Sequence, residues 1–156
     1  VSFVKTESPE PIETIIINEL IGDIVKTVER NGVELTIKEK KTIQTSGRQV
    51  QLKRAFNNII DNSKRYAKQI EIILYTNEKD CVIEFNDDGE GIPKDKYEDV
   101  FKPFFTLDPS RNKLKGESGL GLTITRDIIR SHGGDVKLSE SNLGGLQLKV
   151  LLPLWF

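Results

Sequence analysis

The sequence predicts an α+β fold, an α/β two-layer sandwich in which three helices pack on one face of a sheet of about five strands. Three observations lead to this class. Helical and strand-like apolar patterns alternate along the chain, and the strand-like patterns come in pairs joined by short turns. Of the 156 residues, 37% are apolar and 30% charged, which suits a globular domain with a sizeable core. Strands joined by short turns are antiparallel, so a mixed, mostly antiparallel sheet is expected, with the helices gathered on one side.

The N-terminal part of the chain contains a linker and a first helix. Residues 1–11 combine Ser, Glu and Pro, and we interpret them as a linker or the end of a missing dimerisation helix. The domain is expected to occupy residues 12–156. Asn18 can cap a helix over residues 18–30, whose apolar positions recur at helical spacing.

The next stretch predicts a strand, a short element and a long helix. Residues 33–37 alternate as a half-buried strand, and residues 42–47 are expected to form a short strand or turn. Residues 48–67 predict a second helix. Its core stripe is expected to consist of Leu52, Phe56, Ile59, Ile60 and Ser63.

The second half of the chain predicts two hairpins separated by a lid and a helix. Residues 69–76 and 81–86 read as strands joined by a four-residue turn. Residues 93–117 show little periodicity, and irregular segments of this length are usually lids or binding loops. A third helix is expected over residues 119–131, ending at His-Gly-Gly. Two closing strands then follow, at residues 135–140 and 145–152.

Composition excludes several classes of function. A net charge of −1 gives no general attraction for nucleic acid or for an anionic membrane. No apolar run approaches the roughly 18 residues of a membrane helix, and no signal peptide is expected. The chain has one cysteine and one histidine, so a zinc site has no support. Cys81 lies in a strand pattern and is expected to be a buried, reduced thiol, which indicates a reducing, cytosolic environment.

A turn after the strand of residues 81–86 carries the first candidate site. It reads Asp-Asp-Gly-Glu-Gly-Ile at residues 87–92. Asp87 would lie at the strand end, and Gly89 and Gly91 would let a ligand approach the main chain. A carboxylate accepts from an exocyclic amine but repels phosphate, so this turn suits the base end of a nucleotide. An ordinary Asp-Gly turn is the alternative interpretation.

The second predicted helix carries polar residues that share one face. Asn58 and Asn62 are four residues apart and share a face, which Arg65 and Tyr66 extend by one turn. Asparagine is a mediocre helix former, so its presence in mid-helix suggests a function. A carboxamide oxygen is a suitable ligand for Mg²⁺, which also takes phosphate oxygens. A solvated polar face is the alternative.

Two further motifs lie in and after the lid. Three phenylalanines within residues 101–105 of a polar loop are expected to bury, either as a satellite core or over a bound base. Residues 116–122 then open the third helix with glycines. Backbone N–H groups at such a helix start can hold phosphate, and Lys115 lies just upstream. No Walker-type Gly-Lys-Ser/Thr follows.

In this order, the four motifs resemble those of the ATP-binding catalytic domain of sensor histidine kinases. That family belongs with gyrase-, Hsp90- and MutL-type ATPases, the GHKL group with the Bergerat fold. The resemblance runs from about residue 18 to the C-terminus. Residues 101–112 and 126–135 look most like those of osmolarity-sensor (EnvZ-type) kinases.

The resemblance implies a role for each matching residue. Asn58 and Asn62 match the N box and would be catalytic, with Asn62 as the Mg²⁺ ligand and Asn58 near the phosphates. Asp87 matches the aspartate that accepts from the adenine amino group. The other residues expected to bind ATP or ADP are Arg65, Tyr66, Gly89, Gly91, Ile92, Phe104, Lys115, Gly119, Leu120, Gly121 and Leu122.

Two positions depart from the family pattern. Glu117 stands where the family's last glycine box has its first glycine, and a carboxylate beside a triphosphate is unfavourable unless it points away. Thr106 stands where related kinases often carry a basic residue. The only histidine, His132, matches a structural position at a helix end and not the phosphoacceptor.

The resemblance therefore implies a protein-histidine kinase fragment that is inactive alone. It would bind Mg-ATP and transfer the γ-phosphoryl group to a histidine of a separate dimerisation domain, and from there to a response regulator. We expect a monomeric, cytoplasmic domain without nucleic-acid partners, from a protein anchored in the bacterial inner membrane. The alternatives are a GHKL-type ATPase and a degenerate nucleotide-binding regulatory module.

Overall fold

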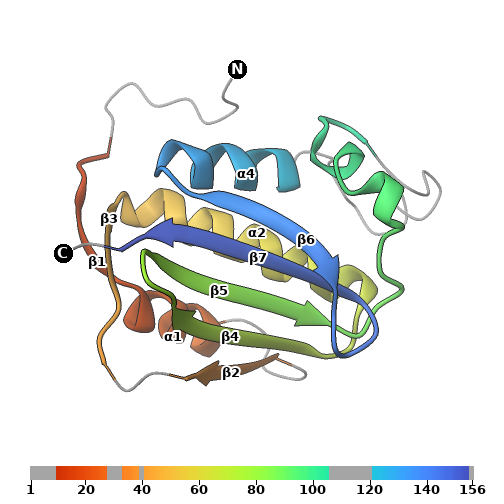
Figure 1. The fold of residues 1–156 in the computed structure, drawn as a ribbon, viewed down its shortest axis with the longest axis horizontal. Helices are drawn as coiled ribbons and strands as arrows, with labels where there is room; N and C mark the ends of the chain where they lie inside the picture. The colour runs from red at the N-terminus through yellow and green to blue at the C-terminus, as the bar shows by residue number, and fades with distance from the viewer. Residues whose placement is uncertain (1–9, 28–32, 39–40, 106–120, 155–156) are drawn as a thin grey trace.

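The fold is known from a computed structural model, which describes residues 10–27, 33–38, 41–105 and 121–154 (Figure 1). Two of its elements, η1 and η2, are single 3-10 turns. In chain order the elements are β1 (Glu13–Ile16), α1 (Ile17–Thr27), β2 (Val33–Ile37), β3 (Gln44–Gly47), α2 (Gln49–Tyr66), β4 (Ile70–Thr76), β5 (Asp80–Asp87), η1 (Lys94–Lys96), η2 (Asp99–Phe101), α4 (Gly121–Ser131), β6 (Asp135–Glu140) and β7 (Leu146–Pro153).

The main sheet has five strands in the order β2-β4-β5-β7-β6. Strands β2 and β4 are parallel, and the other neighbours are antiparallel. Figure 1 shows α1, α2 and α4 as one layer against one face of this sheet. The predicted two-layer α+β sandwich with a mixed, mostly antiparallel sheet is therefore confirmed.

The core lies between the sheet and the helix layer. Strand β4 alternates in burial, so that Ile70, Ile72 and Leu74 point to the helices. All five residues of the predicted α2 stripe are buried, and the rings of Phe56 and Phe85 join the two layers at a centroid distance of 6.2 Å. Cys81 is buried as expected. Because this core fixes both α2 and β5, it also fixes the position of the C-terminal end of α2 and of the turn after β5.

The structure adds a two-stranded sheet. Strand β1, for which there is no sequence prediction, pairs antiparallel with β3, from Glu13 opposite Gly47 to Ile16 opposite Gln44. The "strand or turn" expected at residues 42–47 is thus a strand. Each strand has only four residues, and Ile15 is the one fully buried residue of β1. So short a segment shows no period-two pattern, and its partner supplies the order.

The first helix starts one residue earlier than expected, and its expected cap is wrong. Helix α1 begins at Ile17, and the Asn18 side chain turns away from its own helix. Its Oδ1 accepts from the Ile43 N–H at 2.8 Å, and its Nδ2 donates to the Lys41 carbonyl at 3.3 Å. Asn18 therefore ties α1 to the segment that leads into β3.

Gly134 makes the closest backbone approach in this part of the fold, and its replacement is expected to be costly. A Cβ at Gly134 would lie 2.0 Å from the Leu151 carbonyl oxygen, so Gly134→Ala must push β6 from β7. We expect it to lower the unfolding free energy by at least about 2 kcal/mol in urea denaturation. Gly22→Ala is the control: no atom lies within 4 Å of its Cβ, and removing a helical glycine is expected to add about 0.5–1 kcal/mol. Equal effects of the two variants would contradict the packing argument.

The solvent-facing side of the sheet carries a tyrosine with a perturbed pKa. Burial and the hydrogen bond that Tyr75 donates to the Glu84 carboxylate raise the pKa of Tyr75 from 10.0 to about 12. The protonated phenol therefore stabilises the fold fully below pH 10, and this contribution is lost as pH rises through 12. Tyr75→Phe is expected to flatten the dependence of unfolding free energy on pH in this window. Parallel alkaline losses in both proteins would show that Tyr75 does not titrate in this way.

Candidate functional site

The predicted site residues that the structure describes gather at one end of the molecule. Figure 1 shows the end of β5, the C-terminal half of α2, the start of α4 and the segment of η1 and η2 on the same side. Close approach confirms part of this arrangement, because a Cβ at Gly89 would lie 2.8 Å from the Tyr66 carbonyl oxygen. Helix α2 and the turn after β5 are therefore in direct contact.

Asp87 is held as an acceptor with one oxygen already engaged. The residue is 6% exposed, and Oδ1 accepts from the Gly89 N–H at 3.0 Å and the Leu146 N–H at 2.9 Å. Oδ2 has no hydrogen-bond partner among the described residues. A buried carboxylate with one oxygen fixed by two amides presents the other oxygen in a defined direction. This arrangement can accept a hydrogen bond from an amine of a ligand.

The neighbouring carboxylate has a different role. Asp88 Oδ1 accepts from the N–H groups of Lys68 and Gln69 at 2.8 and 2.9 Å, just after α2 ends. These two hydrogen bonds lower the pKa of the exposed Asp88 carboxyl, and the one from the Gln69 N–H has the larger effect. Asp88 therefore joins the end of α2 to the exit of β5.

The two asparagines of α2 are available for binding. Asn58 and Asn62 are half-buried, one turn apart on the side of α2 away from its core stripe. Neither carboxamide has a hydrogen-bond partner in the described part of the chain. Half-buried amides without protein partners are suited to a metal ion or phosphate oxygens. Arg65 and Tyr66, also half-buried, extend the same surface.

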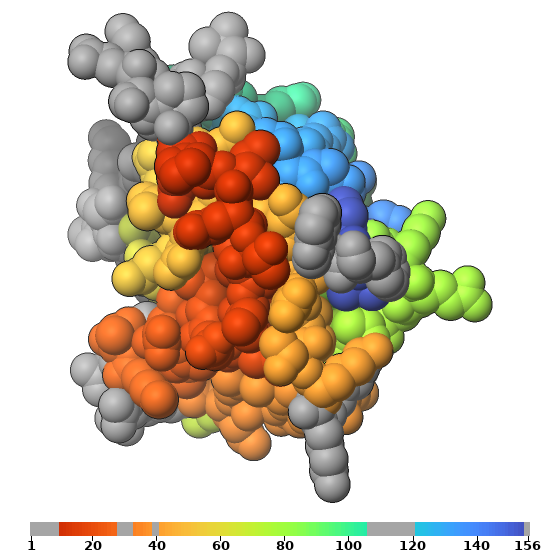
Figure 2. All heavy atoms as spheres, turned by 90° about the vertical axis from the view of Figure 1, so that its left-hand side faces the viewer, coloured from red at the N-terminus to blue at the C-terminus, as the bar shows by residue number. Residues whose placement is uncertain are grey.

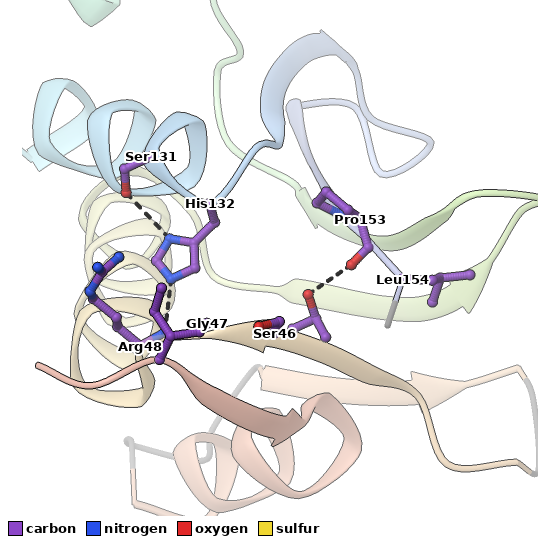
Figure 3. Close-up of a pocket in the computed structure, with 9 residues that line it drawn as sticks. Ser46, Gly47, Arg48, Ser131, His132, Pro153 and Leu154 are labelled. Atoms are coloured by element: carbon purple, nitrogen blue, oxygen red, sulfur yellow. Dashed lines mark hydrogen bonds between the residues drawn. The ribbon is translucent and has the colours of Figure 1, made fainter. Parts of the chain in front are cut away.

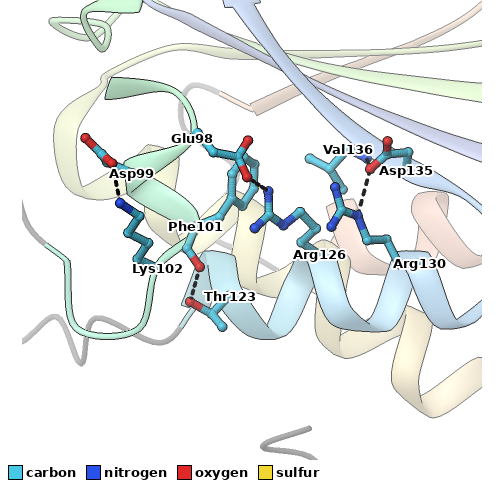
Figure 4. A network of polar contacts seen from close by, with 9 residues as sticks. All are labelled: Glu98, Asp99, Phe101, Lys102, Thr123, Arg126, Arg130, Asp135 and Val136. Atoms are coloured by element: carbon cyan, nitrogen blue, oxygen red, sulfur yellow. Dashed lines mark hydrogen bonds and ion pairs between the residues drawn. The ribbon is translucent and has the colours of Figure 1, made fainter. Parts of the chain in front are cut away.

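The segment after the turn is anchored on α4 (Figure 4). Phe101 is 4% exposed and lies under the Arg126 guanidinium, 4.2 Å from the ring centroid. Arg126 also pairs with Glu98 at 2.7 Å, and the Thr123 hydroxyl donates to the Phe101 carbonyl at 2.7 Å. Residues 93–105 are thereby tied to the first turns of α4. The base of the expected lid is thus a defined structure.

The three phenylalanines do not form one satellite core, so that alternative is wrong, and burial of Phe104 over a bound base stays a prediction. Phe104 is 69% exposed, with φ of 62° in the left-handed region, whereas Phe105 is half-buried. A hydrogen bond from the Phe105 N–H to the Lys102 carbonyl, at 3.2 Å, closes a turn that points Phe104 outward. Phe101 is therefore the anchor of this cluster.

The glycine-opened helix is described only from its second glycine. Helix α4 begins at Gly121, where a Cβ would meet no atom within 4 Å, and Leu122 packs against the core. The expected helix start at residue 119 and the positions of Thr106, Lys115, Glu117, Gly119 and Leu120 lie outside the described residues. Gly91, with φ of 76°, and Ile92 lead from the β5 turn toward η1.

A cavity of about 280 Å³ lies at the opposite end of the molecule, around His132 (Figure 3). His132 Nε2 accepts from the Arg48 N–H at 3.0 Å, so Nδ1 carries the proton and donates to the Ile128 carbonyl at 2.8 Å. Gly47 leaves room for the ring, since a Cβ there would lie 2.6 Å from His132 Cδ2. The structural position predicted for His132 is confirmed.

Glu10 anchors the entering chain at this same end. Its carboxylate accepts from the N–H groups of Val50 and Gln51 at 2.6 and 3.2 Å, in the first turn of α2. In Figure 2, which faces this end, the red segment around β1 lies beside the yellow start of α2. A carboxylate at a helix N-terminus is favourable, so the first described residue already belongs to the packed structure.

Comparison with known proteins identifies the family. The family described as "Histidine kinase-, DNA gyrase B-, and HSP90-like ATPase" matches residues 47–155. The chain belongs to this ATPase family. This chain is 31% identical to sensor histidine kinase GtrS of Pseudomonas aeruginosa, and the match covers 95% of this chain. It is 34% identical to sensor histidine kinase CpxA of Escherichia coli, and that match covers 92% of this chain.

Solved structures agree with the family assignment. The mycobacterial sensor histidine kinase MprB superposes with a TM-score of 0.77 at 25% identity, covering 91% of this chain and 97% of that one. The histidine kinase domain of the E. coli osmosensor EnvZ gives 0.71 at 27% identity, covering 97% and 94%. The chain therefore shares its fold with the catalytic domains of sensor histidine kinases, as the motifs indicate.

The match to the curated relatives is partial. The chain spans 30% of GtrS and 33% of CpxA, about a third of their length. Among the residues that the structure describes, none forms a helix long and apolar enough to cross a bilayer.

The contacts of Gly145 and Leu146 with Asp87 were not predicted from the sequence. The Gly-Gly pair before the last strand is the one sequence signal that could have indicated a close approach there.

Proposed function

We propose that this domain binds Mg-ATP between α2, the β5 turn and the start of α4, and transfers the γ-phosphoryl group to a histidine of a separate dimerisation domain. One observation carries the proposal. A buried carboxylate with one free oxygen, Asp87, lies at the same end of the molecule as two half-buried carboxamides without described partners, Asn58 and Asn62. This combination suits a ligand with an amine at one end and metal-bound phosphates at the other.

Each residue would perform a distinct task. Asp87 Oδ2 would accept from the adenine amino group, with Gly89, Gly91 and Ile92 forming the adjacent wall. Asn62 would ligate the metal, and Asn58 would lie near the phosphates. Arg65 would face the phosphates, and Tyr66 would pack near the base. Gly121 and Leu122 would offer backbone N–H groups at the positive end of α4. Mg²⁺, when bound, would neutralise part of the phosphate charge.

The chain's own contribution to catalysis is positioning. Phosphoryl transfer depends mainly on alignment and charge stabilisation, so no strong base is needed in this domain. A neutral imidazole of the partner already has a lone pair for attack.

Residues 1–11 would connect this domain to the dimerisation helices. The whole protein would be membrane-anchored, with this domain in the cytoplasm and a response regulator as the final acceptor.

An ATP hydrolase of the gyrase type is the competing function. That chemistry uses a carboxylate to activate water. Asn58 occupies the equivalent position, and the one nearby acid of the helix, Asp61, is exposed. A purely regulatory nucleotide-binding module is a third possibility, motivated by Glu117, and it would bind nucleotide without transferring phosphate.

Mixing experiments separate the three functions. The domain is incubated with radiolabelled ATP, Mg²⁺ and the separately expressed histidine-bearing helical domain of the same kinase, and acid-labile label on that partner is followed. Label is expected on the partner and is expected to vanish when the partner's histidine is replaced by alanine. Steady ATP hydrolysis without the partner, abolished by Asn58→Ala, would favour the hydrolase, and nucleotide binding without either activity would favour the regulatory module.

A further inference from the structure

The turn between β6 and β7 lies directly against the Asp87 carboxylate. The Gly145 N–H donates to the Asp87 carbonyl at 3.0 Å, and the next N–H, of Leu146, donates to Asp87 Oδ1 at 2.9 Å. A Cβ at Gly145 would lie 2.1 Å from Oδ1 and 2.6 Å from the Gly89 nitrogen. Both distances are shorter than any real Cβ contact, so only glycine fits while Asp87 holds its position.

These contacts determine which carboxylate oxygen faces a ligand. Oδ1 is fixed by the Leu146 N–H from the β6–β7 turn and by the Gly89 N–H from its own turn. A group that pushes on Oδ1 must rotate or displace the whole carboxylate, because the residue is 6% exposed and has little room. The orientation of Oδ2 therefore depends on a segment 59 residues further along the chain.

We propose that Gly145 and the Leu146 N–H are positioning groups for base selection. They hold Asp87 so that Oδ2 alone is offered, as an acceptor, and this favours a 6-amino purine over a 6-oxo purine. The 6-oxo group is itself an acceptor, so it would leave Oδ2 without a donor. This inference rests on the proposed function, because it concerns the same carboxylate.

The neighbouring glycine provides a matched control. Gly144 lies in the same turn with φ of 99°, and a Cβ there would meet no atom within 4 Å. Gly144→Ala therefore strains the turn without touching Asp87. Gly145→Ala changes the same amount of side chain but drives it into Oδ1.

Calorimetric titration with ADP and IDP, with Mg²⁺ present, measures base selection. We expect the wild-type domain to bind ADP at least about 10-fold more tightly than IDP, the effect of one well-placed hydrogen bond. Gly145→Ala is expected to bring this ratio close to one, whereas Gly144→Ala keeps it even though its melting temperature falls. A loss of selection in Gly144→Ala as large as in Gly145→Ala would assign the effect to the turn as a whole and overturn the proposal.

A second pair of variants tests the amide itself and covers the case in which Gly145→Ala does not fold. Leu146 opens β7, and proline is tolerated as the first residue of a strand. Leu146→Pro removes the N–H that donates to Asp87, and Leu146→Ala keeps it while removing more of the buried side chain. The ADP-to-IDP ratio is expected to fall in the proline variant and to persist in the alanine variant.

The outcomes separate this inference from the function on which it rests. Wild-type protein that binds neither nucleotide, or both equally, would refute the adenine-reading role of Asp87. Wild-type selection that survives unchanged in both Gly145→Ala and Leu146→Pro would leave that role intact and refute the positioning role.

Discussion

Replacing Asp87 with asparagine is expected to weaken ADP binding about 10- to 100-fold, as measured by calorimetry. The asparagine oxygen can still accept from the Gly89 and Leu146 N–H groups that now hold Oδ1. Its NH₂ group would then stand where Oδ2 stands, and a donor would face the donor of the adenine amino group. The loss should therefore exceed that of a single missing hydrogen bond at the surface.

Asp88→Asn is the control for this substitution. It changes an adjacent carboxylate by the same atoms, but that carboxylate binds the backbone of Lys68 and Gln69 and is exposed. We expect its ADP affinity to stay within about twofold of wild type. An Asp87→Asn variant that binds ADP as tightly as Asp88→Asn would remove Asp87 from the nucleotide site.

Replacing Asn62 with alanine is expected to lower phosphotransfer to the partner histidine about 100- to 1000-fold, the usual cost of removing one preorganised electrostatic group. The substitution deletes a half-buried carboxamide without a described partner, so little folding stability should be lost. Nucleotide binding should lose its dependence on Mg²⁺, because a metal ligand is gone. Titrating ADP with and without Mg²⁺ measures this loss separately from transfer.

Asp61→Asn tests the specificity of that result. Asp61 is the residue before Asn62, is exposed, and points to another side of α2. Transfer rate and metal dependence are both expected to remain at wild-type values. Should Asn62→Ala keep its Mg²⁺ dependence while Asp61→Asn loses it, the metal would have to be placed on Asp61.

Local patterns were enough to predict most of the fold and much of the candidate site. The α2 stripe follows from apolar spacing of three and four residues, and the β4–β5 hairpin follows from two strand-like apolar runs on either side of a four-residue turn at Asn77. In that turn the Asn77 side chain accepts from the N–H groups of Lys79 and Asp80, which is local chemistry. Asn62 and Asp87 are site candidates for the same reason, since each lies at a characteristic place in its own element.

Features that depend on distant partners could not be predicted in this way. Strand β1 exists because β3, about 30 residues later, supplies its hydrogen bonds. Gly145 could be read as an ordinary turn glycine until its contact with Asp87 was seen. Phe104 does not join a satellite core, because a left-handed turn points it outward while Phe101 takes the place under Arg126. In each case packing between segments, and not local propensity, decides the outcome.

The hydrogen bonds of His132 imply that this domain does not label itself in the phosphotransfer assay. His132 is the only imidazole of the chain, and both of its ring nitrogens are already committed, one to the Arg48 N–H and one to the Ile128 carbonyl. Phosphorylating Nε2 would break the bond that joins the end of α4 to the start of α2, and phosphorylating Nδ1 would break the bond to the Ile128 carbonyl within α4. Acid-labile radioactivity recovered after a reaction can therefore be credited to the added protein without subtracting self-labelling of this domain.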